Sequence, residues 1–193
     1  MMSCQIKAGP DEPLPPGKLL QVITYLEMGA PPGQRPSQVN PEGIRVARSV
    51  HITADFYRHL YQSVGEPWLW YERNHLTDPA LDRIINHPAN HLYILYVGDK
   101  AAGFAELDFR RPPDLELAYF GLMPDQIGKG YGRLLLKSAI EMGWKLGPDR
   151  LWVHTCNHDH PYALTLYQEE GFIPYHKEEI IIDDPRMSDN PLV

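Results

Sequence analysis

Three glycines at alternating positions, Gly128, Gly130 and Gly132, lie between a strand-like run and an amphipathic segment. A glycine has no Cβ atom, so the backbone there can turn tightly and approach a bound group closely. The helix expected to begin at this turn aims free N–H groups and the positive end of its dipole at the same place. This combination is typical of a site that binds a pyrophosphate.

The composition limits the class of protein and of partner. The chain has 193 residues and a net charge of −7, without a basic stripe, so we expect no nucleic-acid partner. The negative charge agrees with a cationic amine as substrate, although solubility explains it equally well. Two cysteines make no disulfide framework, and no apolar run approaches about 20 residues. We therefore expect a cytoplasmic protein that does not bind a membrane.

The elements around the glycine turn follow from hydrophobic periodicity. Residues 1–193 are expected to fold as a single domain, with a proline-rich arm over about residues 1–17. Apolar and β-branched runs predict strands, and helical spacing predicts helices. The expected strands cover 19–28, 91–97, 101–109, 115–123, 151–156 and 172–182, and the expected helices cover 51–64, 129–146 and 161–170, with a short one from 78.

This order of elements predicts a mixed fold of the α/β (α+β) class. Three successive strands between 91 and 123, joined by tight turns, form an antiparallel meander. The strand at 151–156 follows a helix, so we expect it to run parallel to the strand before it. The predicted architecture is a mixed, mostly antiparallel central sheet flanked by helices.

Two of the expected helices carry local signals. In the first, Phe56, Leu60 and Tyr61 lie at helical spacing and are expected to be buried. Asp78, with Pro79 after it, is expected to be the N-cap of the short helix.

A longer pattern joins the turn to its neighbours. A strand is followed by Met-Pro-Asp (123–125), Gly-Lys-Gly-Tyr-Gly-Arg (128–133), a helix, a strand and Leu-Tyr-x-x-x-Gly-Phe (166–172). Over about residues 90–182 this order resembles the GNAT superfamily of acyl-CoA N-acyltransferases. The resemblance implies that the two parallel strands splay apart and that acyl-CoA enters the cleft between them.

The resemblance also implies acetyl-CoA as the acyl donor. Main-chain N–H groups of the glycine turn would hold the pyrophosphate, and the preceding strand would pair with the pantetheine arm like an added strand. The residues implied to contact the donor are Phe120, Gly121, Leu122, Gly128, Lys129, Gly130, Tyr131, Gly132, Arg133 and His160.

Two positions depart from the pattern of the family. Ile127 stands where an arginine or glutamine usually opens the turn, which leaves the main-chain cradle intact. His160 stands where asparagine is usual. Either His160 takes over that role, or the loop is longer and Asn157 keeps it.

Direct acyl transfer needs a neutral amine, a donor for the oxygen that gains charge, and a proton for the leaving thiolate. Glu116, eleven residues before Ile127, matches the position of a general-base glutamate in the family; the alternative is a surface glutamate. Strand alternation places Glu116, Ala118 and Phe120 on one face, so only a bulge would bring Tyr119 to the same cleft.

Tyr167 is the candidate proton donor. It matches the tyrosine that usually faces the sulfur of CoA in the family, and its ordinary pKa of about 10 suits a donor to a thiolate. The alternative is a core tyrosine that packs a helix on the sheet.

The remaining candidates have less specific signals. His154, His158 and His160 are not spaced as HExxH and span a strand end and a loop, so we expect no metal site. His154 is either a second base or a histidine without a catalytic role. Cys156 is either an acyl-accepting nucleophile or, as we favour, a small buried side chain. Glu27, on the first expected strand, is a candidate for holding a cationic acceptor.

An aromatic cluster formed by Trp68, Trp70 and Tyr71 has two interpretations. These side chains either wall the acceptor pocket or close the core, and the second interpretation is favoured.

The predicted function is transfer of an acetyl group from acetyl-CoA directly to a primary amine of a small molecule or peptide. The alternatives are an acyl-CoA-binding regulatory module without transferase activity and a metal-dependent hydrolase built on the histidines. The resemblance is also compatible with a homodimer.

Overall fold

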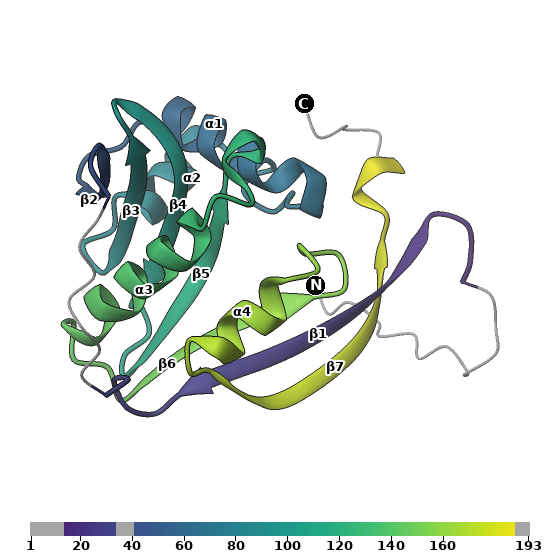
Figure 1. The fold of residues 1–193 in the computed structure, drawn as a ribbon. Coiled ribbons are helices and arrows are strands. Elements are labelled where there is room, and N and C mark those ends of the chain that lie inside the picture. Colours follow the sequence, from purple (N-terminus) through teal and green to yellow (C-terminus); the bar gives the residue numbers. More distant parts are fainter. Residues whose placement is uncertain (1–13, 34–40, 188–193) are drawn as a thin grey trace.

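The computed structural model describes residues 14–33 and 41–187. Residues 1–13, most of the predicted proline-rich arm, lie outside the described residues. The described part forms one seven-stranded sheet in the order β2-β3-β4-β5-β6-β1-β7, with helices on both faces (Figure 1). The strands are β1 Lys18–Met28, β2 Ile44–Ser49, β3 Asn90–Val97, β4 Lys100–Asp108, β5 Asp114–Leu122, β6 Arg150–Cys156 and β7 Ile173–Asp183.

Every pair of neighbouring strands is antiparallel except β5 and β6, which are parallel. The crossover between them is α3 Tyr131–Trp144. The predicted meander and parallel neighbour are therefore confirmed, and so is the mixed, mostly antiparallel sheet.

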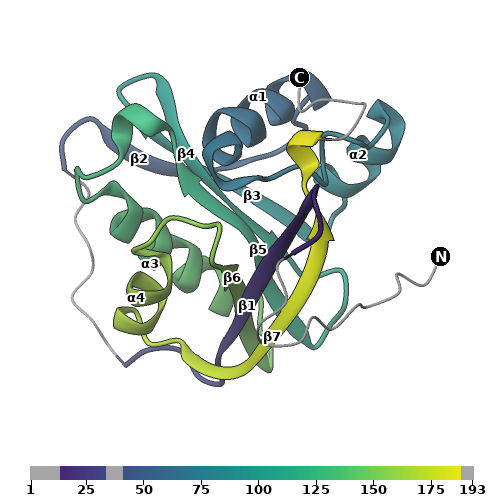
Figure 2. The same ribbon diagram turned by 90° about the vertical axis from the view of Figure 1, so that its right-hand side faces the viewer.

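The helices lie on opposite faces of the sheet. Helices α1 Ala54–Gly65 and α2 Asp78–Ile85 lie on one side, and α3 and α4 Ala163–Glu169 lie on the other (Figure 2). Each face has its own apolar core, since the side chains of β4 alternate between the two. Three short 3-10 segments complete the described elements: η1 Glu66–Trp68, η2 Pro124–Gln126 and η3 Pro185–Met187. In the described residues, no helix has the length and apolar character needed to cross a membrane.

The buried stripe of α1 agrees with the prediction at two of three positions. Leu60 and Tyr61 are buried as expected, whereas Phe56 is 37% exposed and Tyr57 and Val64 complete the stripe. The four buried side chains follow the spacing of successive turns on one face, and Phe56 lies about 100° to the side of Tyr57.

The start of α2 also differs from the prediction. Thr77 occupies the N-cap position, Asp78 is the first helical residue, and Pro79 follows in the first turn. Asp78 thus acts on the positive end of the helix from within the first turn rather than from the cap.

The edge strand β2 was not predicted. It pairs with β3 and alternates apolar Ile44 and Val46 with Arg45, whose guanidinium carbon lies 3.8 Å from the centre of the Tyr96 ring. Arginines at two of its six positions hide the apolar alternation in the sequence. Charged side chains are common on edge strands because they discourage pairing with another chain.

The parallel strands β5 and β6 separate after three pairs. Asp114, Leu115 and Glu116 of β5 pair with Arg150, Leu151 and Trp152 of β6, and no pair follows between the described strands. Figure 1 shows the two strands side by side at one end and apart at the other. The splay that the family resemblance implied is confirmed.

A bulge in β5 lies where the separation begins. Glu106 of β4 pairs with Tyr119, but the next residue, Leu107, pairs with Leu117. Ala118 is therefore the extra residue of a bulge, which changes the direction of the side chains after it. The bulge that the prediction left open is present.

Candidate active site

A cleft of about 800 Å³ occupies the space between the diverging strands β5 and β6. Its lining includes β5 from Glu116 to Leu122, the glycine turn, the end of β6 and the start of α4. The loop from Trp68 to Arg73 contributes a further wall. A cavity of this size matches the usual range for small-molecule sites.

The glycine turn presents main-chain N–H groups to this cleft. Gly128 and Gly130 both have φ of +81°, and a Cβ atom built on either would meet nothing within 4 Å. Gly130 is the N-cap of α3, and no side chain caps the helix there. Within residues 14–33 and 41–187, no acceptor contacts the N–H groups from Gly128 to Arg133. An open helix N-terminus of this kind fits a pyrophosphate.

The polar side chains of the turn are arranged differently from its backbone. Lys129 and Tyr131 do not line the cleft, and Lys129 Nζ donates to Gln126 Oε1 at 3.2 Å. Arg133 lines the cleft but forms ion pairs with Glu169 and, at 3.1 Å, with Glu170. Its charge is already compensated, so the backbone is the main anion-binding group of the turn.

The bulge brings both faces of β5 to the cleft. Glu116, Ala118, Tyr119 and Phe120 all line it, although simple alternation would turn Tyr119 away from Glu116. Beyond Glu116, the edge of β5 that faces β6 is open because the described strands no longer pair there. An open strand edge can accept an extended ligand through main-chain hydrogen bonds.

Glu116 and His154 lie together at the narrow end of the splay. Glu116 Oε1 is 3.5 Å from His154 Nδ1, and their side chains are 25% and 45% exposed. Burial alone would lower the pKa of His154, but the contact with Glu116 and its negative charge, together with the charges of Asp159 and Glu72, outweigh burial, so this pKa is raised above its ordinary value. The two groups are thus coupled in accepting a proton.

Tyr167 lies in the cleft wall opposite the open edge of β5. Its side chain is 5% exposed, and its ring centre lies 6.0 Å from that of Phe120 and 5.9 Å from that of Phe172. Burial, together with the charge of Asp159, raises the pKa of Tyr167. No described residue makes a hydrogen bond to its hydroxyl group. The hydroxyl therefore stays protonated at neutral pH and is free to donate.

His160 and Asn157 occupy different places. His160 lines the cleft, accepts a hydrogen bond at Nδ1 from the Tyr162 N–H at 3.1 Å, and lies with its ring centre 5.2 Å from that of Trp68. Asn157 accepts from the Val22 N–H at 2.8 Å and donates to a carbonyl of β1, so it joins β6 to β1. Of the two, His160 is the one positioned to contact a ligand.

Asp159, in the loop after β6, is held by hydrogen bonds to the end of that strand. It accepts them from Thr155 Oγ1 at 2.7 Å and from the Cys156 N–H at 2.9 Å. Burial and the charge of Asp159 raise the pKa of the Cys156 thiol, which disfavours the thiolate needed for nucleophilic attack.

In the part of the chain that the structure describes, no group of three or more residues is arranged to hold a metal ion.

The aromatic loop after α1 walls the cleft, contrary to the interpretation favoured from the sequence. Trp68, Trp70 and Tyr71 all line it. Trp70 also packs against the rings of Tyr61 and Tyr119, at 5.5 and 5.1 Å between centres, so it serves both the wall and the core. Glu27, the candidate for holding a cationic acceptor, instead binds Arg150 at 2.8 Å and does not line the cleft.

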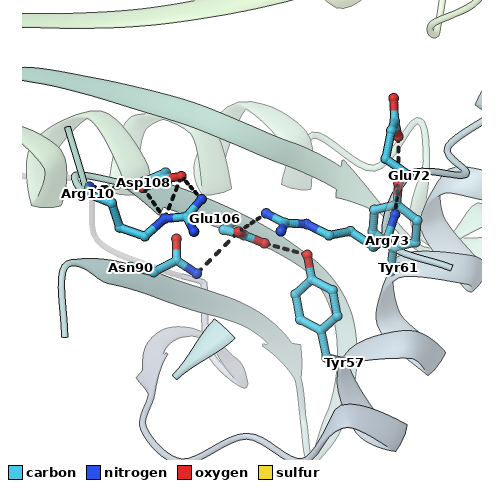
Figure 3. Close-up of polar contacts among 8 residues, drawn as sticks. All are labelled: Tyr57, Tyr61, Glu72, Arg73, Asn90, Glu106, Asp108 and Arg110. Atoms are coloured by element: carbon cyan, nitrogen blue, oxygen red, sulfur yellow. Dashed lines mark hydrogen bonds and ion pairs between the residues drawn. The ribbon is translucent and has the colours of Figure 1, made fainter. Parts of the chain in front are cut away.

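A buried polar network holds this wall in place (Figure 3). Glu106 is fully buried and accepts hydrogen bonds from the Tyr57 hydroxyl, from Arg73 at 2.7 Å and from Asn90 at 3.2 Å. The guanidinium carbon of Arg73 lies 5.2 Å from the centre of the Tyr119 ring. Since Arg73 also lines the cleft, the network joins the loop, the bulge and the core.

A family model described as the acetyltransferase (GNAT) family matches residues 53–172, more than half of the chain. The chain belongs to the GNAT family of acetyltransferases. Among curated proteins, the uncharacterized N-acetyltransferase YvbK of Bacillus subtilis (strain 168) is 33% identical over 98 residues. That alignment covers 50% of this chain and 63% of the relative.

Solved structures share the GNAT fold. A Bacillus subtilis acetyltransferase in complex with CoA is 26% identical, with a TM-score of 0.51 over 67% of this chain and 76% of that chain. A GCN5-related N-acetyltransferase from Sphaerobacter thermophilus is 14% identical, with a TM-score of 0.60 over 84% of this chain and 50% of that chain. The second likeness is one of fold alone.

Sequence reasoning missed three groups at the site of this GNAT protein. Glu72 and Arg73 line the cleft, and Asp159 shapes its edge. The run Trp-Leu-Trp-Tyr-Glu-Arg (68–73) contained a signal for the first two, because a charged pair directly after three aromatic residues is unusual for a buried cluster. Asp159 gave no signal, since its partners are main-chain and hydroxyl groups.

Proposed function

We propose that the protein transfers the acetyl group of acetyl-CoA directly to a primary amine. The observation that carries the proposal is the open edge of β5, which has the glycine turn at one end and the Glu116–His154 pair at the other. A ligand with an anionic group, which the glycine turn can hold, and an extended arm, which the edge of β5 can pair with, fits these features. Membership of the GNAT family and a CoA complex of a Bacillus subtilis relative support CoA as the carrier.

Acetyl-CoA supplies the acetyl group as a thioester. The amides from Gly128 to Arg133 hold its pyrophosphate, and the main chain of Phe120, Gly121 and Leu122 pairs with its pantetheine arm. The acetyl carbonyl is thereby directed to the bulge, where main-chain N–H groups can stabilise the oxygen that gains charge.

Glu116 and His154 provide the base. A primary amine is an ammonium ion at neutral pH and must lose a proton before it can attack. Neutral His154 accepts this proton, directly or through water, and the carboxylate of Glu116 stabilises the imidazolium that forms. The negative charge of Glu116 also attracts the ammonium form of the acceptor.

Tyr167 provides the acid. As the bond from carbon to nitrogen forms, the bond from carbon to sulfur breaks, and the leaving thiolate takes the hydroxyl proton of Tyr167. The tyrosinate then takes up a proton, either from solvent or from the attacking nitrogen, which must lose a proton to become the amide. The raised pKa of Tyr167 keeps the hydroxyl protonated before transfer.

The test is release of free CoA thiol from acetyl-CoA in the presence of a panel of primary amines, with mass spectrometry of the amine. We expect a mass gain of one acetyl group on an amine in step with thiol release. CoA binding without thiol release for any amine in the panel would contradict the proposal and favour a binding module.

A further inference from the structure

A second cavity, of about 360 Å³, adjoins the cleft. It shares Asp108, Arg110 and Glu116 with the cleft, so the two cavities meet at Glu116, which with His154 provides the proposed catalytic base. Its remaining walls come from the strands beyond the splay and from the turn that precedes β5, through Tyr25, Arg111, Asp114, Arg150, Trp152 and Tyr175. The cavity is thus a second approach to the point where acyl transfer takes place.

One wall of this cavity is an aromatic shelf, formed by Tyr25, Trp152 and Tyr175. The Tyr25 ring centre lies 6.4 Å from that of Trp152, with the rings stacked, and 6.2 Å from that of Tyr175. Trp152 is paired in register with Glu116, so the shelf begins beside the base. An aromatic ring of a ligand gains from offset stacking against such side chains.

The shelf lies on the sheet face opposite α3 and α4, and the Arg150 guanidinium carbon lies 5.6 Å from the centre of the Tyr175 ring. Helices α1 and α2 pack against β3, β4 and β5, whereas the shelf lies on β1, β6 and β7. Tyr175 is 46% exposed, and Tyr25 and Trp152 are half-buried. Three neighbouring aromatic side chains that are only partly covered beside a catalytic base indicate a ligand surface rather than a core.

The charges that line the second cavity are mostly paired with each other. Arg110 donates to both carboxylate oxygens of Asp108, at 2.9 Å and 3.0 Å from Nε. Arg150 binds Asp114 at 2.7 Å and also Glu27. These contacts leave little net charge at this part of the wall.

Two charged groups of the cavity remain, one of each sign. Glu116 has only His154 as a charged partner among the described residues, and Arg111 is exposed and forms no ion pair there. A ligand with one ammonium and one carboxylate complements this pair, whereas a polyamine would place a second cation near Arg111. The two charged groups and the aromatic shelf together therefore favour a zwitterionic ligand that carries an aromatic ring.

We propose that the second cavity binds the acceptor and that the acceptor is an aromatic amino acid. This inference rests on the proposed acetyl transfer and names its substrate. The amino group lies at Glu116, the carboxylate at Arg111, and the ring on the aromatic shelf. The product is the N-acetyl amino acid, formed with release of CoA.

The test uses thiol release with L-phenylalanine, phenethylamine, L-alanine and spermidine on the purified protein. We expect kcat/KM to be highest for L-phenylalanine, because phenethylamine lacks the carboxylate, L-alanine lacks the ring, and spermidine lacks both. Equal or higher kcat/KM for L-alanine or spermidine would overturn the acceptor class while leaving acetyl transfer intact.

The variant that isolates the carboxylate contact is Arg111→Gln. We expect it to raise KM for L-phenylalanine about tenfold and to leave kcat and the KM for phenethylamine unchanged. Only the amino acid has a carboxylate, so only the amino acid loses a contact when Arg111 is replaced. Arg83→Gln, at an exposed arginine of α2, is the matched control and should change neither KM. An equal change for both amines in Arg111→Gln would overturn the contact.

A binding measurement separates this inference from the proposed function. Calorimetric titration of L-phenylalanine into the protein saturated with CoA needs no turnover. Binding that Arg111→Gln weakens about tenfold supports the second cavity even if no amine in the panel releases thiol, in which case the proposed transfer fails alone. Absence of L-phenylalanine binding in both proteins would overturn the inference.

Discussion

The two ends of the cleft are built from different parts of the chain. The end assigned to the donor is made mainly of backbone: the open N–H groups of the glycine turn and the free edge of β5. The end assigned to the acceptor, where the second cavity adjoins the cleft, is made of side chains from segments far apart in the sequence, among them Tyr25, Glu116 and Tyr175. Backbone sites suit a ligand that all members of a family share, whereas side chains can differ between members without a change of fold.

This difference predicts that the donor end is damaged most by changes to the backbone. Gly130→Asp places a side chain at φ of +81° and adds negative charge where the pyrophosphate is expected. We expect CoA affinity to fall about 1,000-fold or more, because strain, bulk and charge repulsion act together. The measurement is calorimetric titration with CoA.

The matched control is Gly98→Asp, in the turn between β3 and β4. Gly98 has φ of +59° and also open space around a built Cβ atom, but it lies outside the cleft. This variant should keep its CoA affinity. Equal loss in both variants would show that backbone strain alone, and not the cradle, explains the effect.

At the boundary between the two ends, Tyr167→Phe removes one oxygen and keeps the packing of the ring. We expect kcat to fall about 100-fold or more, with less than about a threefold change in KM for acetyl-CoA, because the hydroxyl acts on the leaving group only during transfer. Steady-state kinetics by thiol release measures both constants. Tyr96→Phe on β3 is the control, and an unchanged kcat in Tyr167→Phe would remove this residue from the mechanism.

At the acceptor end, Glu116→Gln tests the coupling with His154. Because Glu116 raises the pKa of His154, neutral His154 is available only above a pH higher than its ordinary pKa of about 6.5. In the wild type kcat/KM should therefore rise with pH through that raised value.

Glu116→Gln removes the largest contribution that raises this pKa, whereas burial, which lowers it, and the smaller raising effects of Asp159 and Glu72 remain. We expect the rising limb of the pH profile to move to lower pH, while the maximal rate falls about 30-fold because the imidazolium is no longer stabilised. The measurement is kcat/KM against pH with one amine. A rising limb of kcat/KM at the same pH in the wild type and in Glu116→Gln would contradict the coupling between Glu116 and His154.

The smallest effect on the cleft is expected for Tyr57→Phe in the buried network. It removes one hydrogen bond to the fully buried carboxylate of Glu106. We expect the free energy of unfolding to fall by about 2 kcal/mol, since a hydrogen bond to a charged group contributes about 1.5–3 kcal/mol. Urea denaturation measures this loss, and CoA affinity should change by less than about twofold. A larger loss of CoA affinity than of stability would mean that the network reaches the donor end.

The same contrast explains which features the sequence could predict. Strands β3 to β6 and helix α3 were predicted within about two residues, because their apolar runs and glycine stops are local signals. The glycine turn was predicted for the same reason. Strand β2 was missed because its arginines interrupt the apolar alternation.

Features that depend on distant partners were not predictable in this way. The bulge at Ala118 is defined only by the register with β4, so alternation alone could not show that Glu116 and Tyr119 share the cleft. The aromatic residues of the loop from Trp68 to Arg73 were interpreted as part of the core. They line a cleft that exists only because β5 and β6 splay apart, and the local sequence does not show that splay. The distance between Glu116 and His154 likewise exists only in the folded sheet.

A crystal structure of the protein with CoA tests the assignment of the donor site most directly. We expect the pyrophosphate within hydrogen-bonding distance of the N–H groups from Gly128 to Arg133, and the pantetheine arm along the edge of β5 with its sulfur near Tyr167. CoA bound elsewhere, or β5 and β6 paired along their full length with no space between them, would contradict this assignment.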